Sequence, residues 1–136
     1  MNTKIKTFDV QFKELTTSFQ KAFEYISNPE NLPKWTMAFS QADQESALMV
    51  TPRGELSVKL KTEADYETGV VDWHMTLPDG SEGTAYSRLT RLPDGHVVYS
   101  FVLLAPPVPL ELLEGALAEQ SGILAGELET LGRILG

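Results

Sequence analysis

Two histidines and the carboxylates near them are the residues of this 136-residue chain best suited to acid–base chemistry. His74 follows Asp72 by two residues, and in an extended strand this spacing puts both side chains on one face, where an imidazole could act as a general base. A base needs a desolvated pocket and a substrate within reach, but the strand pattern described below turns this face outward. An exposed polar cluster with Tyr86 and Arg88 is therefore the better interpretation.

Other familiar chemistries find little support in the residue types. The chain has no cysteine, which excludes disulfides, thiolate nucleophiles and cysteine zinc sites. His96 follows a turn glycine and is expected to be solvated, and two distant histidines with scattered carboxylates predict no metal site and no other cofactor. Neither a glycine-rich phosphate loop nor a GxSxG elbow is present. The sequence therefore assigns no catalytic residue.

The charge balance limits the partners. Nineteen acidic residues against eleven basic ones give a net charge of −8, which opposes binding to nucleic acid and stable association with anionic membranes. An uncharged pocket could still hold one lipid-like molecule. Residues 1–10 lack the apolar core of a signal peptide, and the apolar run at 101–110 is too short and too rich in proline to span a bilayer. A cytoplasmic location is predicted.

Three segments with the same turn chemistry organise the middle of the chain: TPRG at 51–54, LPDG at 77–80 and LPDG at 92–95. Proline presets φ at the second position and glycine accepts a left-handed conformation at the fourth, which suits a type I turn followed by a bulge. We expect each turn to pair its first residue with the residue after the glycine: Thr51 with Glu55, Leu77 with Ser81, and Leu92 with His96.

These registers assign side chains to faces, because a slip of one residue would exchange the two faces of a strand. The first hairpin is expected to share one apolar face: Leu48, Val50, Leu56, Val58 and Leu60. The second and third turns agree on the strand that they share, and together they predict one inward face: Trp73, Met75, Gly83, Ala85, Ser87, Tyr99 and Phe101. Small residues opposite large ones leave room for a ligand or allow tight packing, and the sequence leaves both open.

Helical patterns flank these hairpins. Residues 8–12 alternate as a half-buried strand, with Phe8, Val10 and Phe12 on one face. A short helix capped by Thr16 or Thr17 is expected to follow and to end near Ser27, before Pro29 and Pro33. Residues 110–135 predict a long helix with one leucine stripe: Leu110, Leu113, Leu117, Leu124, Leu128, Leu131 and Leu135. Gly115, Gly122 and Gly126 lie on the opposite side.

Several of these segments resemble the START-related, or SRPBCC, superfamily, which includes polyketide cyclase/dehydrase-like and lipid-transfer proteins. The similar segments are AFEYISNPENLPKW at 22–35, GVVDWHMTLPDG at 69–80, the second PDG, and LAGELETLGRIL at 124–135. The resemblance implies an α+β helix-grip fold over residues 1–136 as a single domain. A curved antiparallel sheet would wrap around a long C-terminal helix, with a short helix pair after the first strand.

The resemblance also implies a hydrophobic cavity between sheet and helix, with Trp35 and Met37 closing one end. The expected ligand-binding residues are Trp35, Met37, Trp73, Met75, Ser87, Tyr99, Phe101, Leu117 and Leu124. Binding of a small hydrophobic ligand, lipid-like or aromatic and polyketide-like, is the leading hypothesis. The alternative is an aromatase/cyclase or dehydratase-type enzyme that uses Tyr99, Ser87 or Arg91.

One apolar group falls on the outer face of the third hairpin. Val98, Val102 and Leu104 lie there beside Tyr86, which is a large apolar area for a surface. A homodimer through this surface and cover by the N-terminal or APPVPL segment both remain open.

Overall fold

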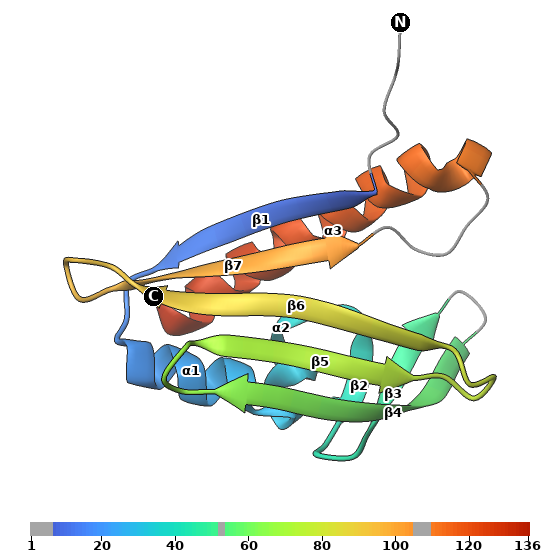
Figure 1. Ribbon diagram of the computed structural model, residues 1–136, viewed down its shortest axis with the longest axis horizontal. Coiled ribbons are helices and arrows are strands. Elements are labelled where there is room, and N and C mark those ends of the chain that lie inside the picture. The colour runs from blue at the N-terminus through green and yellow to red at the C-terminus, as the bar shows by residue number, and fades with distance from the viewer. Residues whose placement is uncertain (1–6, 52–53, 105–109) are drawn as a thin grey trace, which may run out of the picture.

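The computed structural model describes residues 7–51, 54–104 and 110–136, with side chains in the last helix described from Leu117 onward. Its elements follow the predicted order: β1 Phe8–Leu15, α1 Phe19–Ser27, a 3₁₀ turn Pro29–Asn31, α2 Leu32–Trp35, β2 Phe39–Ala42, β3 Ser46–Thr51, β4 Gly54–Asp65, β5 Val70–Thr76, β6 Glu82–Arg91, β7 Val97–Leu104 and α3 Leu110–Leu135. The strands form one seven-stranded antiparallel sheet in the order β1-β7-β6-β5-β4-β3-β2 (Figure 1).

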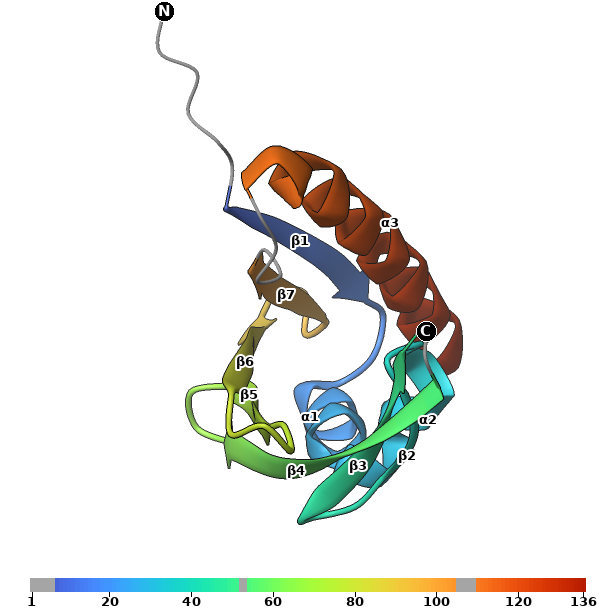
Figure 2. The ribbon, with the colours of Figure 1, turned by 90° about the vertical axis from the view of Figure 1, so that its right-hand side faces the viewer.

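The sheet curls around the short helices and α3 crosses its open side (Figure 2). Each strand after β2 pairs with its sequence neighbour, whereas β1 pairs with β7 at the far edge. Such an arrangement encloses the concave face of the sheet beneath α3 and leaves the convex face outside. The predicted α+β helix-grip architecture is therefore confirmed.

The two LPDG turns have the predicted registers. The backbone N–H of Leu77 donates to the Ser81 carbonyl at 2.9 Å, and that of Leu92 donates to the His96 carbonyl at 2.9 Å. Gly80 and Gly95 have φ values of 88° and 89°, which a residue with a Cβ rarely adopts. Both hairpins therefore place their strands in the phase expected from the sequence.

The register predicted for the first turn was wrong. Thr51 pairs with Gly54 rather than Glu55, and this shift of one residue turns the preceding residues of β3 to the other face relative to β4. Ala47 and Met49 consequently point inward, opposite Val58 and Leu56, respectively. Leu48 and Val50, expected on the inner face with them, lie on the outer one, and Val50 is 51% exposed. Residues 52–53 of the turn lie outside the described part of the chain.

The predicted cap of α1 is also corrected. Ser18 is the N-cap, and its hydroxyl accepts a hydrogen bond from the Lys21 N–H at 3.2 Å. Thr16 is instead tied to the end of the chain, because its backbone N–H donates to the Gly136 carbonyl at 2.6 Å. The helix ends at Ser27 as expected, and the side chain of Asn28 caps the following 3₁₀ turn by accepting from the Glu30 N–H.

The leucine stripe of α3 faces the sheet. Leu117, Leu124, Leu128 and Leu131 are buried, whereas Gly122 and Gly126 have open space around their Cα atoms. The side chains of Leu110 and Leu113 and the surroundings of Gly115 lie outside the described residues. A core of aromatic and aliphatic side chains fills the space between this stripe, α1 and the concave sheet.

Candidate functional site

A cavity of about 390 Å³ lies between the sheet, α3 and the segment that joins α2 to β2. Its walls are mainly aromatic and aliphatic side chains. The lining residues are Leu32, Trp35, Thr36, Met37, Ala38, Phe39, Met49, Val50, Trp73, Met75, Ala85, Phe101, Leu103, Gln120, Ile123, Leu124 and Glu127. A mainly apolar space of this volume, open to solvent on one side, has the size of an ordinary small-molecule site.

The break in the chain after α1 positions Trp35 in the wall of the cavity. Pro29 begins the 3₁₀ turn, and the Asn31 side chain donates to the Tyr25 carbonyl at 3.0 Å, which fixes the turn against α1. The single turn of α2 then places Trp35 inside, only 3% exposed. Met37, two residues further on, is 70% exposed and lies at the mouth of the cavity.

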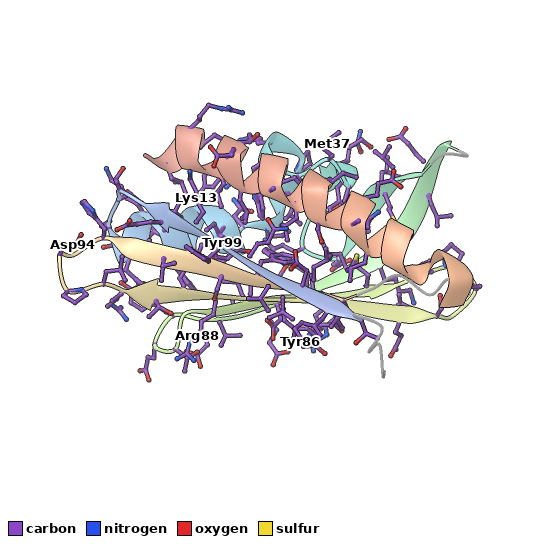
Figure 3. The ribbon with its side chains drawn as sticks, turned by 90° about the horizontal axis from the view of Figure 1, so that it is seen from above. Lys13, Met37, Tyr86, Arg88, Asp94 and Tyr99 are labelled. Carbon is purple, nitrogen blue, oxygen red and sulfur yellow. The ribbon has the colours of Figure 1, made fainter. Side chains whose placement is uncertain are left out.

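Three aromatic residues form the floor beside the cavity. The ring of Trp35 lies 6.2 Å from that of Trp73 and 6.1 Å from that of Tyr99, at the spacing of ordinary aromatic pairs. Tyr99 lies between the sheet and α3 (Figure 3). The indole nitrogens of Trp35 and Trp73 are buried without a hydrogen-bond partner. Burial raises the pKa of the Tyr99 phenol, so this group stays neutral at physiological pH.

Glu127 is the charged group among the described lining residues. Its Oε2 accepts a hydrogen bond from the backbone N–H of Met37 at 2.6 Å, which ties α3 to the mouth of the cavity. Burial raises the pKa of its carboxyl, and the hydrogen bond from Met37 opposes this effect in part. A carboxyl group in an apolar wall can bind a polar ligand group or exchange a proton.

The structure brings most of the predicted site residues together. Six of them line the cavity: Trp35, Met37, Trp73, Met75, Phe101 and Leu124. Ser87, Tyr99 and Leu117 are buried but are not among the lining residues.

Two of the three polar residues suggested for catalysis lie away from the cavity. The Ser87 hydroxyl donates to the Val71 carbonyl, so a backbone group occupies it. The guanidinium of Arg91 lies 3.6 Å from the centre of the Phe19 ring, away from the cavity lining. Neither group is placed to act on a molecule in the cavity.

Glu127 was not among the site residues predicted from the sequence, although its position in the helix carries a signal. Glu127 is three residues after Leu124 and four before Leu131, so helical periodicity puts it directly beside the leucine stripe. A carboxylate at the edge of a buried apolar stripe can have a specific partner or a ligand.

His74 lies on the outer face, as expected, but with other partners than predicted. Its Nε2 is 2.7 Å from Glu63 Oε2 and its Nδ1 is 3.1 Å from Thr84 Oγ1. Tyr86 and Arg88 lie on the same side of the sheet, away from α3 (Figure 3), and the Arg88 guanidinium donates to the Thr68 carbonyl. Across the described ranges no three metal-ligating side chains converge.

Comparison with known proteins relates the chain to others through its fold. No protein-family model matches the sequence, and no curated protein matches it significantly. Three solved structures illustrate the likeness: XoxI from Bacillus cereus (11% identity, 96% of each chain, TM-score 0.69), a START superfamily protein from Mycobacterium smegmatis (12% identity, 96% of this chain and 97% of that one, TM-score 0.64) and the di-domain ARO/CYC BexL from the BE-7585A biosynthetic pathway (11% identity, 94% of this chain and 46% of that one, TM-score 0.69).

No helix in the described part of the chain is long and apolar enough to cross a membrane.

Similarity to solved structures at these sequence identities concerns the fold alone. The helix-grip sheet, the long terminal helix and the match to these structures together show that the chain has a START-like (SRPBCC-like) fold.

Proposed function

We propose that residues 1–136 act as one START-like domain that binds a small, mostly apolar molecule in the cavity between the sheet and α3. The observation that carries this proposal is the 390 Å³ volume beside the buried pair Trp35 and Trp73. A concave space of this size, open at one side and lined mainly by apolar groups with one charged side chain, has the character of a small-molecule site.

The volume also limits the size of the ligand. An apolar cavity of about 150 Å³ is enough to bind benzene, and the cavity here measures about 390 Å³. A molecule with two or three rings, or a branched chain of similar size, would fit. Flat aromatic molecules would gain most, because the wall contains the aromatic rings of Trp35, Trp73 and Phe101.

The structural neighbours support the same class of function. One of them is described as a START superfamily protein and another as a di-domain ARO/CYC of a biosynthetic pathway. These descriptions favour lipid-like and polyketide-like ligands. On the sequence grounds given above, we also propose that binding takes place in the cytoplasm.

The test uses a neutral apolar fluorophore, N-phenyl-1-naphthylamine, titrated with the purified protein. We expect saturable binding to the wild type and its loss in Ala85→Phe, because Ala85 lines the cavity and a phenyl ring would fill it. Ala64→Phe, which changes an exposed position of β4, is the matched control and keeps the binding. Equal binding by both variants would contradict the proposal. Native mass spectrometry of protein from its own host would identify a bound molecule.

A second candidate function rests on Glu127. A buried carboxyl with a raised pKa is a suitable proton donor or acceptor, so an aromatase/cyclase or dehydratase-type reaction is the alternative. If the protein catalyses such a reaction, a molecule incubated with it should be recovered with its mass reduced by one water. Glu127→Gln would stop this change while leaving binding in place. Recovery of the unchanged molecule from the wild type would favour binding alone.

A further inference from the structure

Glu127 has unused hydrogen-bonding capacity. Its Oε2 accepts from the Met37 N–H at 2.6 Å. Among the residues that the structure describes, no other donor bonds this carboxylate and no lysine or arginine pairs with it. The second oxygen of this half-buried carboxylate therefore remains free to accept a hydrogen bond from a bound molecule.

The donors near this cavity are less available than the carboxylate. The indole nitrogens of Trp35 and Trp73 have no partner, but protein atoms cover them. An acceptor on a ligand would reach them only after the surrounding side chains move. Of the other polar lining residues, Thr36 donates its hydroxyl to the Leu32 carbonyl at 2.8 Å, and Gln120 is uncharged and exposed. Glu127 is the charged group of the lining and therefore has the strongest influence on which polar groups the cavity accepts.

Resting on the proposed function, we propose that the ligand is an apolar molecule carrying a hydroxyl or amine, whose O–H or N–H donates to Glu127, and that the cavity discriminates against carboxylates. A donor paired with a partly desolvated carboxylate forms a charge-assisted hydrogen bond, which is stronger than a neutral one. A carboxylate in the same place would meet a like charge and lose its own hydration.

Three naphthalene derivatives of similar size test this preference: 2-naphthol, 2-methylnaphthalene and 2-naphthoate. Binding is measured at neutral pH by calorimetry and by the fluorescence of Trp35 and Trp73. For the wild type we expect 2-naphthol to bind about tenfold more tightly than 2-methylnaphthalene, as one hydrogen bond to a charged group allows. We expect 2-naphthoate to bind most weakly.

Glu127→Gln separates recognition of the ligand from the bond to Met37, because a glutamine can still accept from that N–H. In this variant the 2-naphthoate affinity should rise and the preference for 2-naphthol should fall severalfold. Glu119→Gln, at an exposed position of α3, is the control and keeps the wild-type order. If the wild type does not distinguish the naphthol from the methyl compound, the preference is wrong and cavity binding stands. If none of the three binds, both proposals fail.

A second inference comes from the outside of the sheet. Strand β1 has its apolar face outward, with Phe12 72% exposed and Val10 52% exposed. Its polar residues point inward instead: Gln11 donates to the Ser121 carbonyl at 2.8 Å and Lys13 pairs with Glu129 at 2.9 Å, both on α3. The strand is half-buried as predicted, but its apolar face is the exposed one.

The neighbouring strands continue this apolar surface. The registers place Phe8 beside Leu104, Val10 beside Val102, and Val102 beside Tyr86. We name this surface the outer patch and define it by six residues: Phe8, Val10, Phe12, Tyr86, Val102 and Leu104. None of these six side chains is charged. The whole chain has a net charge of −8, so two copies repel each other least where both contact surfaces are neutral.

The size of the outer patch fits a second copy. An aromatic side chain has about 150–250 Å² to bury, so the exposed fractions of Phe8, Val10, Phe12, Tyr86 and Leu104 give the patch an area on the order of 500 Å². Two such patches face to face bury about 1,000 Å², near the lower limit for a specific interface. We infer that the outer patch joins two copies of this chain in a reversible homodimer.

Sedimentation over a range of concentrations tests the dimer. We expect the wild type to shift from one to two copies as its concentration rises through the micromolar range, and Phe12→Lys to stay monomeric with unchanged circular dichroism. Ile134→Lys, which adds the same charge at an exposed isoleucine of α3 outside the outer patch and the cavity, should dimerise like the wild type. A wild type that is monomeric at all concentrations would overturn the inference. This is the result expected if residues 1–6 or 105–109 of the same chain cover the patch. Dimerisation of Phe12→Lys would overturn it as well.

Discussion

The space under α3 is packed solid at one end and hollow at the other. At the packed end Leu15, Ile26, Leu89, Val97 and Leu131 are at most 1% exposed. At the cavity end the inward residues of the same strands are only half-buried: Met75, Ala85, Phe101 and Leu103. One curved sheet thus supports both a core and a binding site.

Side-chain size at paired positions explains part of this contrast. At the packed end Leu89 pairs with Tyr99, two large side chains. At the cavity end Met75 pairs with Gly83, and Trp73 pairs with Ala85, so a large residue faces a small one.

The helices explain the rest. α1 lies at the packed end of the sheet and buries Phe19, Ala22 and Ile26 there (Figure 1). At the cavity end the cover is the short α2 and the segment around Met37. The cavity therefore lies where the sheet extends beyond α1.

The largest expected effect comes from comparing the stability of Leu131→Ala with that of Leu124→Ala. Leu131 is fully buried at the packed end, so its truncation leaves a closed void and should cost about 3–5 kcal/mol of unfolding free energy. Leu124 borders a cavity that already exists, so its truncation should cost about 2 kcal/mol, the transfer contribution alone. Urea denaturation measures both. Equal costs would mean that the two ends are packed alike.

Gly69→Ala probes the packed end through the backbone. Gly69 has φ of 79°, and a Cβ there would lie 2.0 Å from the carbonyl oxygen of Leu89. That strand also donates its Leu89 N–H to the Gly69 carbonyl at 2.8 Å, so it cannot move away without losing this bond. We expect a loss of about 2–3 kcal/mol by thermal or urea unfolding. Gly122→Ala is the control, since nothing lies near its Cα, and it should leave stability unchanged or raise it.

The sequence predicted the strand phase correctly where the turn pattern was specific to one hairpin geometry. The two LPDG turns fixed the inward face of Trp73 and Phe101, because glycine at a positive φ closes only certain hairpins. The TPRG turn has the same proline and glycine but closes one residue earlier. The apolar run Leu48–Val50 offered no correction, since either phase of it puts apolar side chains inside.

The candidate site was predicted less completely than the fold. The aromatic wall followed from strand phase, whereas the empty volume depends on where α1 ends relative to the sheet, which no local pattern encodes. Likewise, alternation in β1 identified two faces, but only the position of α3 shows that Gln11 and Lys13 are the inner ones.

Glu127→Gln tests the cavity end through pH. Burial raises the carboxyl pKa above its ordinary value of 4.5 in the folded state, so the folded state binds the proton more tightly than the unfolded one. Stability of the wild type therefore falls as pH rises from the ordinary value through the raised one, by about 1.4 kcal/mol for each unit of pKa difference. The glutamine variant lacks this loss and should melt at a higher temperature than the wild type near pH 7. Near pH 4 the variant and the wild type should melt at equal temperatures. A difference in melting temperature that stays constant with pH would contradict this expectation.

Glu129→Gln, two residues along the same helix, should have the smallest effect and the opposite dependence on pH. Glu129 is exposed and pairs with Lys13 at 2.9 Å; that hydrogen bond and the lysine charge lower the pKa of its carboxyl. The contribution of this pair is therefore present above the ordinary pKa and is lost as pH falls through the lowered one. Water and salt screen an exposed pair, so the variant should melt close to the wild type at physiological salt and slightly below it at low salt. Melting curves at two salt concentrations measure this, and a large loss that persists in high salt would show that α3 depends on its bond to β1 more than on the leucine stripe at the packed end.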